Sequence, residues 1–153
     1  MLTGWRILKS RYREHAFDGE GARFYGGRWN GPGYAMIYTA ESIALAVLEI
    51  LVHIESQQQL VDYQLGSAKF PESAIEHLDL ERLPADWRRS PGPGQLQQIG
   101  NEWCAQGSSA VLQVPSVITG ERESNYLLNP AHPDFATIEL NEPEAFWIDP
   151  RLG

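Results

Sequence analysis

Arginines in a glycine-rich segment are the first residues whose type and spacing could do chemistry. Arg23 and Arg28 lie in GEGARFYGGRWN, and six glycines fall between Asp18 and Gly33. A guanidinium fork matches two phosphate oxygens, and nearby glycines let backbone N–H groups converge on the same anion. The segment therefore predicts an anion clamp, with Arg28 as its main candidate. The alternative is that either arginine pairs with a surface carboxylate in a tight turn, which is common and nearly neutral in energy.

A carboxylate interrupts the most apolar run of the chain. Glu49 stands within IALAVLEILV, where a buried carboxylate would need a partner. At about 100° per residue, Ser42, Glu49, His53 and Ser56 fall on one narrow helical stripe. That stripe is either the solvent face of an amphipathic helix or the lining of a pocket. The apolar residues on both sides of it favour the pocket.

Three more polar residues could face a ligand, but taken singly each is more often structural. Tyr38 could be a core aromatic with a satisfied hydroxyl. Ser116 follows a proline at a predicted strand end and could form a turn. Asn129 belongs to an Asn-Pro pair, which is typical of turns. None of the three carries an argument alone.

Several familiar catalytic motifs are absent. In GEGARF, Phe24 stands where a dinucleotide fingerprint needs its third glycine, and GARFYGGR offers Gly27 and Arg28 where a P-loop needs Lys and then Ser or Thr. VPSVI is not the G-x-S-x-G elbow of an esterase. The four histidines have no metal-ligand spacing and Cys104 is the single cysteine, so no metal site is predicted.

Net charge and cysteine content limit the classes of partner and the cellular compartment expected for the chain. The net charge of -8 argues against direct nucleic-acid binding, although a few arginines in a cleft can still attract a small anion. The lone cysteine excludes an internal disulfide and fits a reducing, cytoplasmic compartment. Neither a signal peptide nor a membrane span is expected from the apolar pattern.

The elements that must position these residues alternate irregularly, which favours a compact α+β domain. The chain has 153 residues, 42% of them hydrophobic, as expected for one globular domain. Residues 18–33 contain too much glycine for a regular helix and are predicted to form a functional loop between short strands. A helix that carries Glu49 is predicted from Thr39 or Glu41 to about Gln57. The other expected elements are a strand and then a loop in residues 1–15, strands at 36–39, 60–70 and 110–115, a short piece at 77–84, a helix from Leu96 that stops at Gly107, a loop or turn at 125–134, and a last strand at 135–140.

Taken together, three segments in this order and spacing resemble the RES domain family of bacterial toxins. They are GEGARFYGGRWN, YTAESIALAVLEILVH and VPSVITGERESNYLLNPAHPDF. The resemblance extends over nearly the whole chain and describes residues 1–153 as a single RES domain. The family is named for an arginine, a glutamate and a serine, which fall here on Arg28, Glu49 and Ser116.

The resemblance implies a fold similar to ADP-ribosyltransferases, with two small sheets, flanked by helices, around a cleft for NAD⁺. It implies growth arrest through loss of NAD⁺, and an Xre-like helix-turn-helix antitoxin that blocks the active site. The antitoxin would bind operator DNA, so contact of this chain with DNA would be indirect. Whether the toxin is a homodimer in that complex is left open by the sequence.

The resemblance also gives the site residues their roles. Cleavage of the nicotinamide–ribose bond develops oxocarbenium character, which the Glu49 carboxylate would stabilise. Arg28 would hold the pyrophosphate, Tyr38 would stack on or position the nicotinamide ribose, and Ser116 would hydrogen-bond the substrate near the scissile bond. The remaining predicted substrate-binding residues are Arg23 and Asn129.

The acceptor decides the reaction. Nicotinamide leaves as a neutral base, so no cofactor is expected beyond NAD⁺ as substrate, and the acceptor is water or inorganic phosphate as co-substrate. One alternative is an ADP-ribosyltransferase that modifies a cellular protein. A second is a non-catalytic binding module in which Arg28 and Glu49 pair only to support the fold.

Overall fold

The structure is a computed structural model that describes residues 1–54 and 60–153. It confirms one compact domain of mixed α+β content, in which a single sheet of seven strands carries few helices. The strands are β1 (Leu2–Lys9), β2 (Ile37–Ala40), β3 (Tyr63–Phe70), β4 (Ile75–His77), β5 (Val111–Ser116), β6 (Gly120–Leu128) and β7 (Glu139–Phe146). The α-helices are α1 (Glu20–Tyr25), α2 (Ile43–Leu51) and α3 (Gly94–Gln106), and 3-10 turns span Ser10–His15, Glu72–Ala74, Leu80–Arg82, Pro133–Thr137 and Pro150–Leu152.

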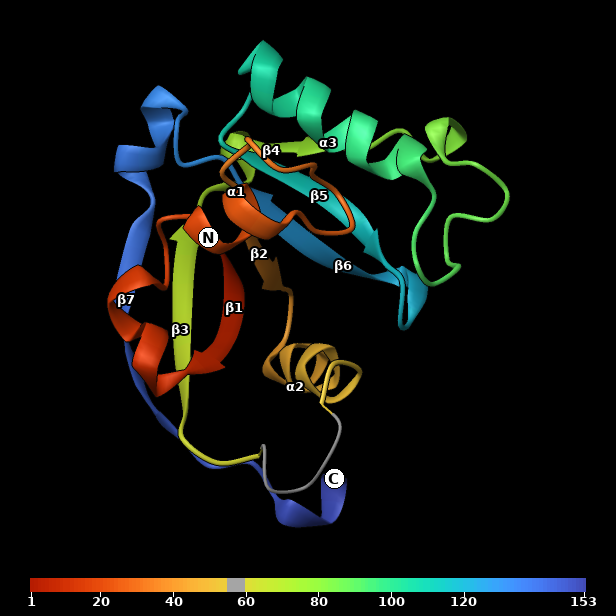
Figure 1. Cartoon of the computed structure of the whole chain (residues 1–153). Coiled ribbons are helices and arrows are strands. Elements are labelled where there is room, and N and C mark those ends of the chain that lie inside the picture. Colours follow the sequence, from red (N-terminus) through yellow and green to blue (C-terminus); the bar gives the residue numbers. More distant parts are fainter. Residues whose placement is uncertain (55–59) are drawn as a thin grey trace.

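The sheet has the order β4-β5-β6-β2-β1-β3-β7 and consists of two halves. Only β4 and β5 pair in parallel; the other neighbours are antiparallel. The halves β4-β5-β6-β2 and β1-β3-β7 meet at one residue pair, Trp5 with Ala40, and their strands run in different directions in Figure 1. The expected two small sheets are therefore corrected to two halves of one sheet, which separate where β2 leaves β1 after a single pair.

Each half packs a helix against its own apolar cluster. Leu96, Ile99 and Trp103 of α3 join a core with β5 and β6, and Leu45 and Ala46 of α2 join a core with β1. Figure 1 shows α3 alongside β4 and β5, and α2 at the opposite end of β2. The two helices thus lie at different ends of the junction between the halves.

Helix α2 is shorter than predicted at both ends. Thr39 and Ala40 belong to β2, and Ser42 starts the helix because its side chain accepts a hydrogen bond from the Leu45 N–H at 3.0 Å. The helix ends at Leu51. The predicted Ser56 and Gln57 lie outside the described residues. The prediction for α3 is confirmed, including its stop at Gly107, which adopts a positive φ of 61°.

Three local predictions are wrong. The glycine-rich segment contains the short helix α1, bounded by Gly19 and Gly26 at φ 71° and 75°. The segment 125–128 is not a loop but the end of β6, where it pairs with both β5 and β2. The last strand begins at Glu139 after a 3-10 turn and continues through Pro143, which an edge strand tolerates.

Among residues 1–54 and 60–153, no helix combines the length and apolar content that a membrane crossing needs.

Candidate functional site

A cleft of about 900 Å³ opens where the two halves of the sheet meet. Its walls come from β1, β2, α1, α2 and the segments 88–92 and 117–118. Arg28, Tyr38 and Glu49 all line it, although they come from a loop, a strand and a helix. Arg23, Ser116 and Asn129 are not among its lining residues. The structure therefore brings together three of the six predicted site residues.

Arg28 lies at the tip of a tight turn. Gly27 and Asn30 form an isolated bridge, with the Gly27 N–H donating to the Asn30 carbonyl at 2.9 Å, and Arg28 and Trp29 occupy the two positions between them. The Arg28 Nη1 donates to the carbonyl oxygens of Trp87 at 3.2 Å and Arg89 at 2.9 Å. Burial lowers the pKa of Arg28, while the charge of Glu49 acts in the opposite direction. The guanidinium keeps further donors for a ligand, because these bonds use one nitrogen.

The Arg28 turn is fixed from beneath by Tyr38 and Asn30. The Tyr38 hydroxyl donates to Asn30 Oδ1 at 2.5 Å and accepts from the Trp29 N–H at 3.1 Å. Asn30 is fully buried, and its Nδ2 donates to three carbonyls, one of them that of Ala22 in α1 at 2.8 Å. Burial raises the pKa of Tyr38 above its ordinary range, so the hydroxyl keeps its proton. Tyr38 therefore positions Arg28 as well as facing the cleft.

Helix α3 holds the same turn from the side. Gln97 donates to the Gly27 carbonyl at 2.9 Å, and the Gly31 N–H donates to Asn101 at 3.0 Å. Trp29 is buried against the helix, and its carbonyl oxygen would lie 1.6 Å from a Cβ at position 100. Gly100 is thus required for this approach, because any side chain there would overlap the backbone.

Glu49 is partly buried in the cleft wall formed by α2. Burial raises the pKa of its carboxyl, and a hydrogen bond from Asn125 together with the charges of His53 and Arg28 partly offsets that shift. Glu49 and His53 of the predicted stripe line the cleft, which supports the pocket alternative for these two residues, whereas Ser42 caps the helix and Ser56 lies outside the described residues. A carboxylate held close to, but not paired with, an arginine can stabilise a developing positive charge.

Arg23 takes the alternative that the sequence left open. It forms an ion pair with Glu20 of the same short helix, and its guanidinium stacks on the Phe24 ring at 4.5 Å from the ring centre. About two-fifths of its side chain is exposed (42%). Arg23 therefore belongs to an ion pair on the surface of α1.

Ser116 and Asn129 are buried and hold turns. The Ser116 Oγ accepts hydrogen bonds from the N–H groups of Ile118 and Thr119, both at 3.1 Å. The Asn129 Oδ1 accepts from the Ala131 N–H at 3.0 Å. Ser116 thereby shapes the β5–β6 turn, whose residues 117 and 118 do line the cleft.

The cleft also contains polar residues that were not predicted from the sequence, among them Arg6, Arg88 and Asn125. Asn125 was assigned to a loop, whereas β6 places it beside Glu49 and the Thr39 carbonyl, to which it donates at 3.2 Å. Arg88 binds the carbonyls of Val117 and Ile118, both at 3.0 Å. Arg6 stands between Trp5 and Ile7 in β1, and a charged residue within an apolar stretch was the available signal.

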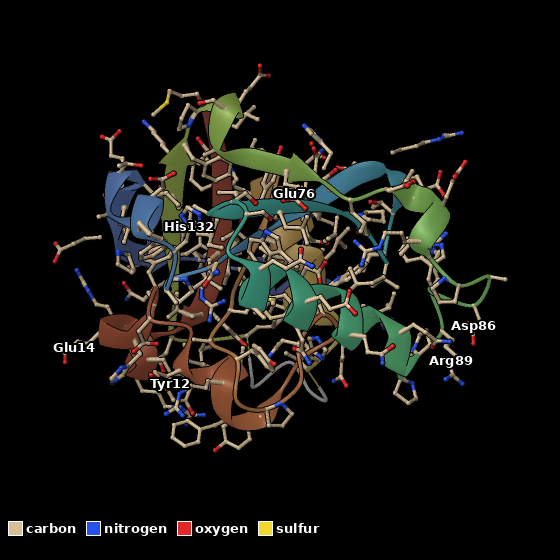
Figure 2. The ribbon with its side chains drawn as sticks, turned by 90° about the horizontal axis from the view of Figure 1, so that it is seen from above. Tyr12, Glu14, Glu76, Asp86, Arg89 and His132 are labelled. Carbon is tan, nitrogen blue, oxygen red and sulfur yellow. The ribbon has the colours of Figure 1, made fainter. Side chains whose placement is uncertain are left out.

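The cleft contains the groups needed to bind an anion and to stabilise a cation. In the part of the chain that the structure describes, no group of three or more His, Cys, Asp or Glu side chains could hold a metal ion. Figure 2 places Asp86 and Arg89 at the rim of the molecule, where their side chains form a surface ion pair at 3.1 Å. The backbone of the same segment faces inward, where it accepts from Arg28.

Comparisons with known proteins identify relatives over nearly the full length. The curated "Toxin Res" of Yersinia enterocolitica is 42% identical over 149 residues, covering 97% of each chain. The "Prs ADP-ribosylating toxin" of a Sphingobium species is 35% identical over 153 residues, covering 97% of this chain and 94% of that protein. A solved structure of the M. tuberculosis MbcT–MbcA toxin–antitoxin complex matches with a TM-score of 0.78 and 20% identity, covering 99% of this chain and 86% of that chain. This last likeness shows the fold.

Comparison of the chain with models of whole families gives the same result, and it does not depend on any single relative. The model of the RES domain matches residues 3–149, a range that includes every cleft residue described above. Two curated proteins with more than 40% identity carry the name of Res toxins. The chain therefore belongs to the RES domain family of toxins.

Proposed function

We propose that this toxin destroys NAD⁺ by cleaving the bond between nicotinamide and ribose. The observation that carries the proposal is that Arg28 and Glu49 line one cleft, each acting on the pKa of the other. No ion pair between the two is found in the described residues. NAD⁺ has matching parts: an anionic diphosphate, and a ribose carbon that becomes cationic as nicotinamide departs.

The proposed reaction requires the protein to bind the substrate and to stabilise a positive charge. The electron pair of the N-glycosidic bond passes to the nicotinamide ring nitrogen, which leaves neutral and needs no general acid, metal ion or further cofactor. The Glu49 carboxylate stabilises the positive charge left on the ribose carbon. Attack by water then gives ADP-ribose and a proton, and attack by inorganic phosphate gives ADP-ribose 1-phosphate.

Tyr38 takes part through its ring. Its hydroxyl is already used by Trp29 and Asn30, so it has no free donor for the substrate. The ring can still stack on the nicotinamide ribose while the hydroxyl holds the Arg28 turn. Phenylalanine in place of Tyr38 would keep the stacking ring and lose only the hydroxyl that holds the Arg28 turn.

Nicotinamide release from pure protein tests the proposal. Unmutated chain is incubated with NAD⁺ in buffers with and without inorganic phosphate, and nicotinamide, ADP-ribose and ADP-ribose 1-phosphate are separated by chromatography. We expect stoichiometric nicotinamide and one of the two sugar products, and their ratio identifies the acceptor. A folded chain that releases no nicotinamide under either condition would rule the proposal out and favour a non-catalytic binding module.

A second candidate is transfer of ADP-ribose to a cellular protein. It is favoured by the Sphingobium relative, whose name describes an ADP-ribosylating toxin. Incubation of the chain with labelled NAD⁺ and a bacterial lysate separates the two reactions. A discrete labelled protein band supports transfer, whereas label found only in free ADP-ribose or its phosphate supports destruction of NAD⁺.

The proposed protein partner is an antitoxin of the Xre-like helix-turn-helix class that covers the cleft. The support is the fold match to a toxin solved in a toxin–antitoxin complex. Such a partner would supply the DNA contact that this acidic chain lacks. Co-expression with a neighbouring helix-turn-helix reading frame should restore growth, and the mass of the purified complex would show whether the toxin is present as a homodimer.

A further inference from the structure

The proposed hydrolysis of NAD⁺ requires a group that takes up a proton. When water attacks the ribose carbon, its oxygen bonds to that carbon, and the electron pair of the broken bond leaves with nicotinamide. The attacking water must also lose a proton, and a positioned base accelerates such a transfer by about 100- to 10,000-fold. Glu49 is proposed for the developing cation, so a second group is needed for this proton.

Most of the basic groups in the cleft are already engaged. The carboxylate and imidazole side chains among its described lining residues are His15, Asp18, Glu20, Glu49 and His53. Both Asp18 oxygens are bound, one to His15 Nδ1 at 2.6 Å and the other to the Glu20 N–H at 3.0 Å. Glu20 is itself paired with Arg23. Beside the Glu49 carboxylate, the two histidines therefore remain as candidates.

The two histidines belong to different walls of the cleft. His15 lies between β1 and α1, whereas His53 follows α2, the helix that carries Glu49. Burial raises the pKa of Glu49. A hydrogen bond from Asn125 and the charges of His53 and Arg28 oppose that shift, and His15 is not among these groups. His53 is therefore the histidine that lies near the carboxylate.

His53 continues the Glu49 wall by one turn. Val52 keeps helical φ and ψ angles of -70° and -13°, and the His53 N–H donates to the Ile50 carbonyl at 3.1 Å. Residues four positions apart on such a path lie on one face, with their Cβ atoms about 5–6 Å apart. That spacing lets one small molecule contact both the carboxylate and the imidazole.

The His53 ring is available to such a molecule. In the part of the chain that the structure describes, the ring has no hydrogen bond or ion pair, whereas the Nδ1 atoms of His15 and His132 are both bonded. The residue is also exposed, so solvent reaches it. A neutral imidazole has one nitrogen that can accept a proton. The alternative is a structural role, in which the ring only supports the carbonyls at the end of α2.

We propose that His53 is the general base for the water acceptor: its imidazole takes the proton of the attacking water and passes it to solvent, while Glu49 stabilises the ribose cation. The inference rests on the proposed function and assigns the acceptor side of the same site. It also separates the two acceptors, because inorganic phosphate already carries anionic oxygens and attacks without losing a proton. His53 therefore serves the formation of ADP-ribose and not that of ADP-ribose 1-phosphate.

The test measures these two products separately. Unmutated chain and His53→Gln are incubated with NAD⁺ in buffers with and without inorganic phosphate, and both sugar products are quantified. We expect His53→Gln to form ADP-ribose about 100-fold more slowly and ADP-ribose 1-phosphate at nearly the parental rate. Added imidazole should restore part of the hydrolysis by His53→Ala. A fall in both products alike, without rescue by imidazole, would show a structural role and overturn the inference.

Two further histidine variants serve as controls. His77→Gln changes an exposed residue of β4 that is not among the described cleft lining, and both products should be unchanged. His15→Gln tests the rival base, and it should form ADP-ribose faster than His53→Gln.

Three results would overturn the inference and leave the proposed function standing, because nicotinamide is still released in each. They are equal ADP-ribose formation by unmutated chain and folded His53→Gln, loss of ADP-ribose formation in His15→Gln instead, and an unmutated chain that forms ADP-ribose 1-phosphate but no ADP-ribose. A folded, unmutated chain that releases no nicotinamide would reject both ideas. The failure of the inference is therefore distinguishable from that of the proposed function.

Discussion

Arg23 and Arg28 are five positions apart in one glycine-rich segment, yet they have opposite environments. Arg23 lies on the outer face of α1 and is paired with Glu20, whereas Arg28 lies in the cleft without a carboxylate partner in the described residues. The difference arises from the turn that follows α1, which directs Arg28 inward under the control of Tyr38 and Asn30. Residue type and glycine content are the same for both. We therefore propose Arg28, which the protein leaves without a carboxylate partner, as the ligand-binding arginine of the segment, and Arg23 as the structural one.

The same contrast holds for charge as a whole. A net charge of -8 would repel an anionic substrate at long range, but local arginines with low-dielectric walls reverse the sign within a cleft. Neutralising a cleft charge should therefore change function, and neutralising a paired surface charge should change very little. The following variants test this contrast in order of expected effect.

Glu49→Gln should have the largest effect. The amide oxygen can still accept from Asn125, so the fold is retained, but the charge that stabilises the ribose cation is lost. We expect kcat for nicotinamide release to fall by about 100- to 1,000-fold. Glu102→Gln, which removes the partner of Arg82 on the exposed side of α3, is the matched control. Equal losses in both variants would show that the cleft carboxylate has no special role.

Arg28→Met should have the second-largest effect. Removal of a charge-assisted contact to phosphate should raise KM for NAD⁺ by roughly 10- to 100-fold. Initial rates over a range of NAD⁺ concentrations give KM and kcat separately. A variant with unchanged KM but lowered melting temperature would mean that Arg28 only anchors the carbonyls of Trp87 and Arg89.

The pH dependence of kcat reports on Glu49. Burial raises the pKa of this carboxyl, so it takes up its proton at a higher pH than the ordinary glutamate value of about 4.3. Under the proposed function the ionised form is the active one, so activity should be present above the raised pKa and fall by about tenfold per pH unit below it. The acid limb should be absent from the residual activity of Glu49→Gln. An acid limb of kcat centred at the ordinary glutamate pKa would instead indicate an exposed carboxylate.

Ser116→Ala should act mainly on stability. Its hydroxyl is buried and accepts two backbone N–H groups, which the alanine variant would leave without partners. We expect the free energy of unfolding, measured with urea, to fall by about 1–3 kcal/mol. If NAD⁺ cleavage disappears while the free energy of unfolding is unchanged, Ser116 contacts the substrate directly.

Arg23→Met should have the smallest effect. An exposed ion pair contributes about 0–1 kcal/mol, and nothing in the cleft depends on it. KM, kcat and the melting temperature should all stay close to those of the unmutated chain. A rise in KM as large as that of Arg28→Met would remove the distinction between paired and unpaired arginines.

The sequence allowed much of this site to be anticipated, and its gaps have physical causes. Arg28 and Glu49 were candidates from the local pattern that the family resemblance then favoured, whereas Tyr38 was predicted from the resemblance alone. Arg6 was missed because an arginine between strand residues gives no sign of which arginines find carboxylates; that depends on contacts far along the chain. Asn125 was missed because a polar strand, GERESNYLL, lacks the apolar alternation that marks a half-buried strand.

The fold was predictable to a similar extent. α3 followed from helical spacing and its glycine stop, whereas the last strand was predicted too early, because the acidic, proline-containing sequence of β7 has low strand propensity. Pairing with β3 makes it a strand, and pairing is a tertiary effect. The junction of the two half-sheets at one residue pair likewise depends on where β2 ends, which no local signal encodes.

The close contact at Gly100 determines which substitutions α3 can tolerate. Alanine is preferred over glycine by about 1 kcal/mol in a helix interior, so stabilising libraries would routinely replace a glycine in the middle of α3. Here the replacement would push the helix away from Trp29 and loosen the turn that it supports. A saturation screen of α3 should therefore accept many residues at exposed positions and reject even alanine at position 100. Such a profile would show that the close approach of α3 to Trp29, and with it the support of the Arg28 turn, depends on the missing side chain at this one position.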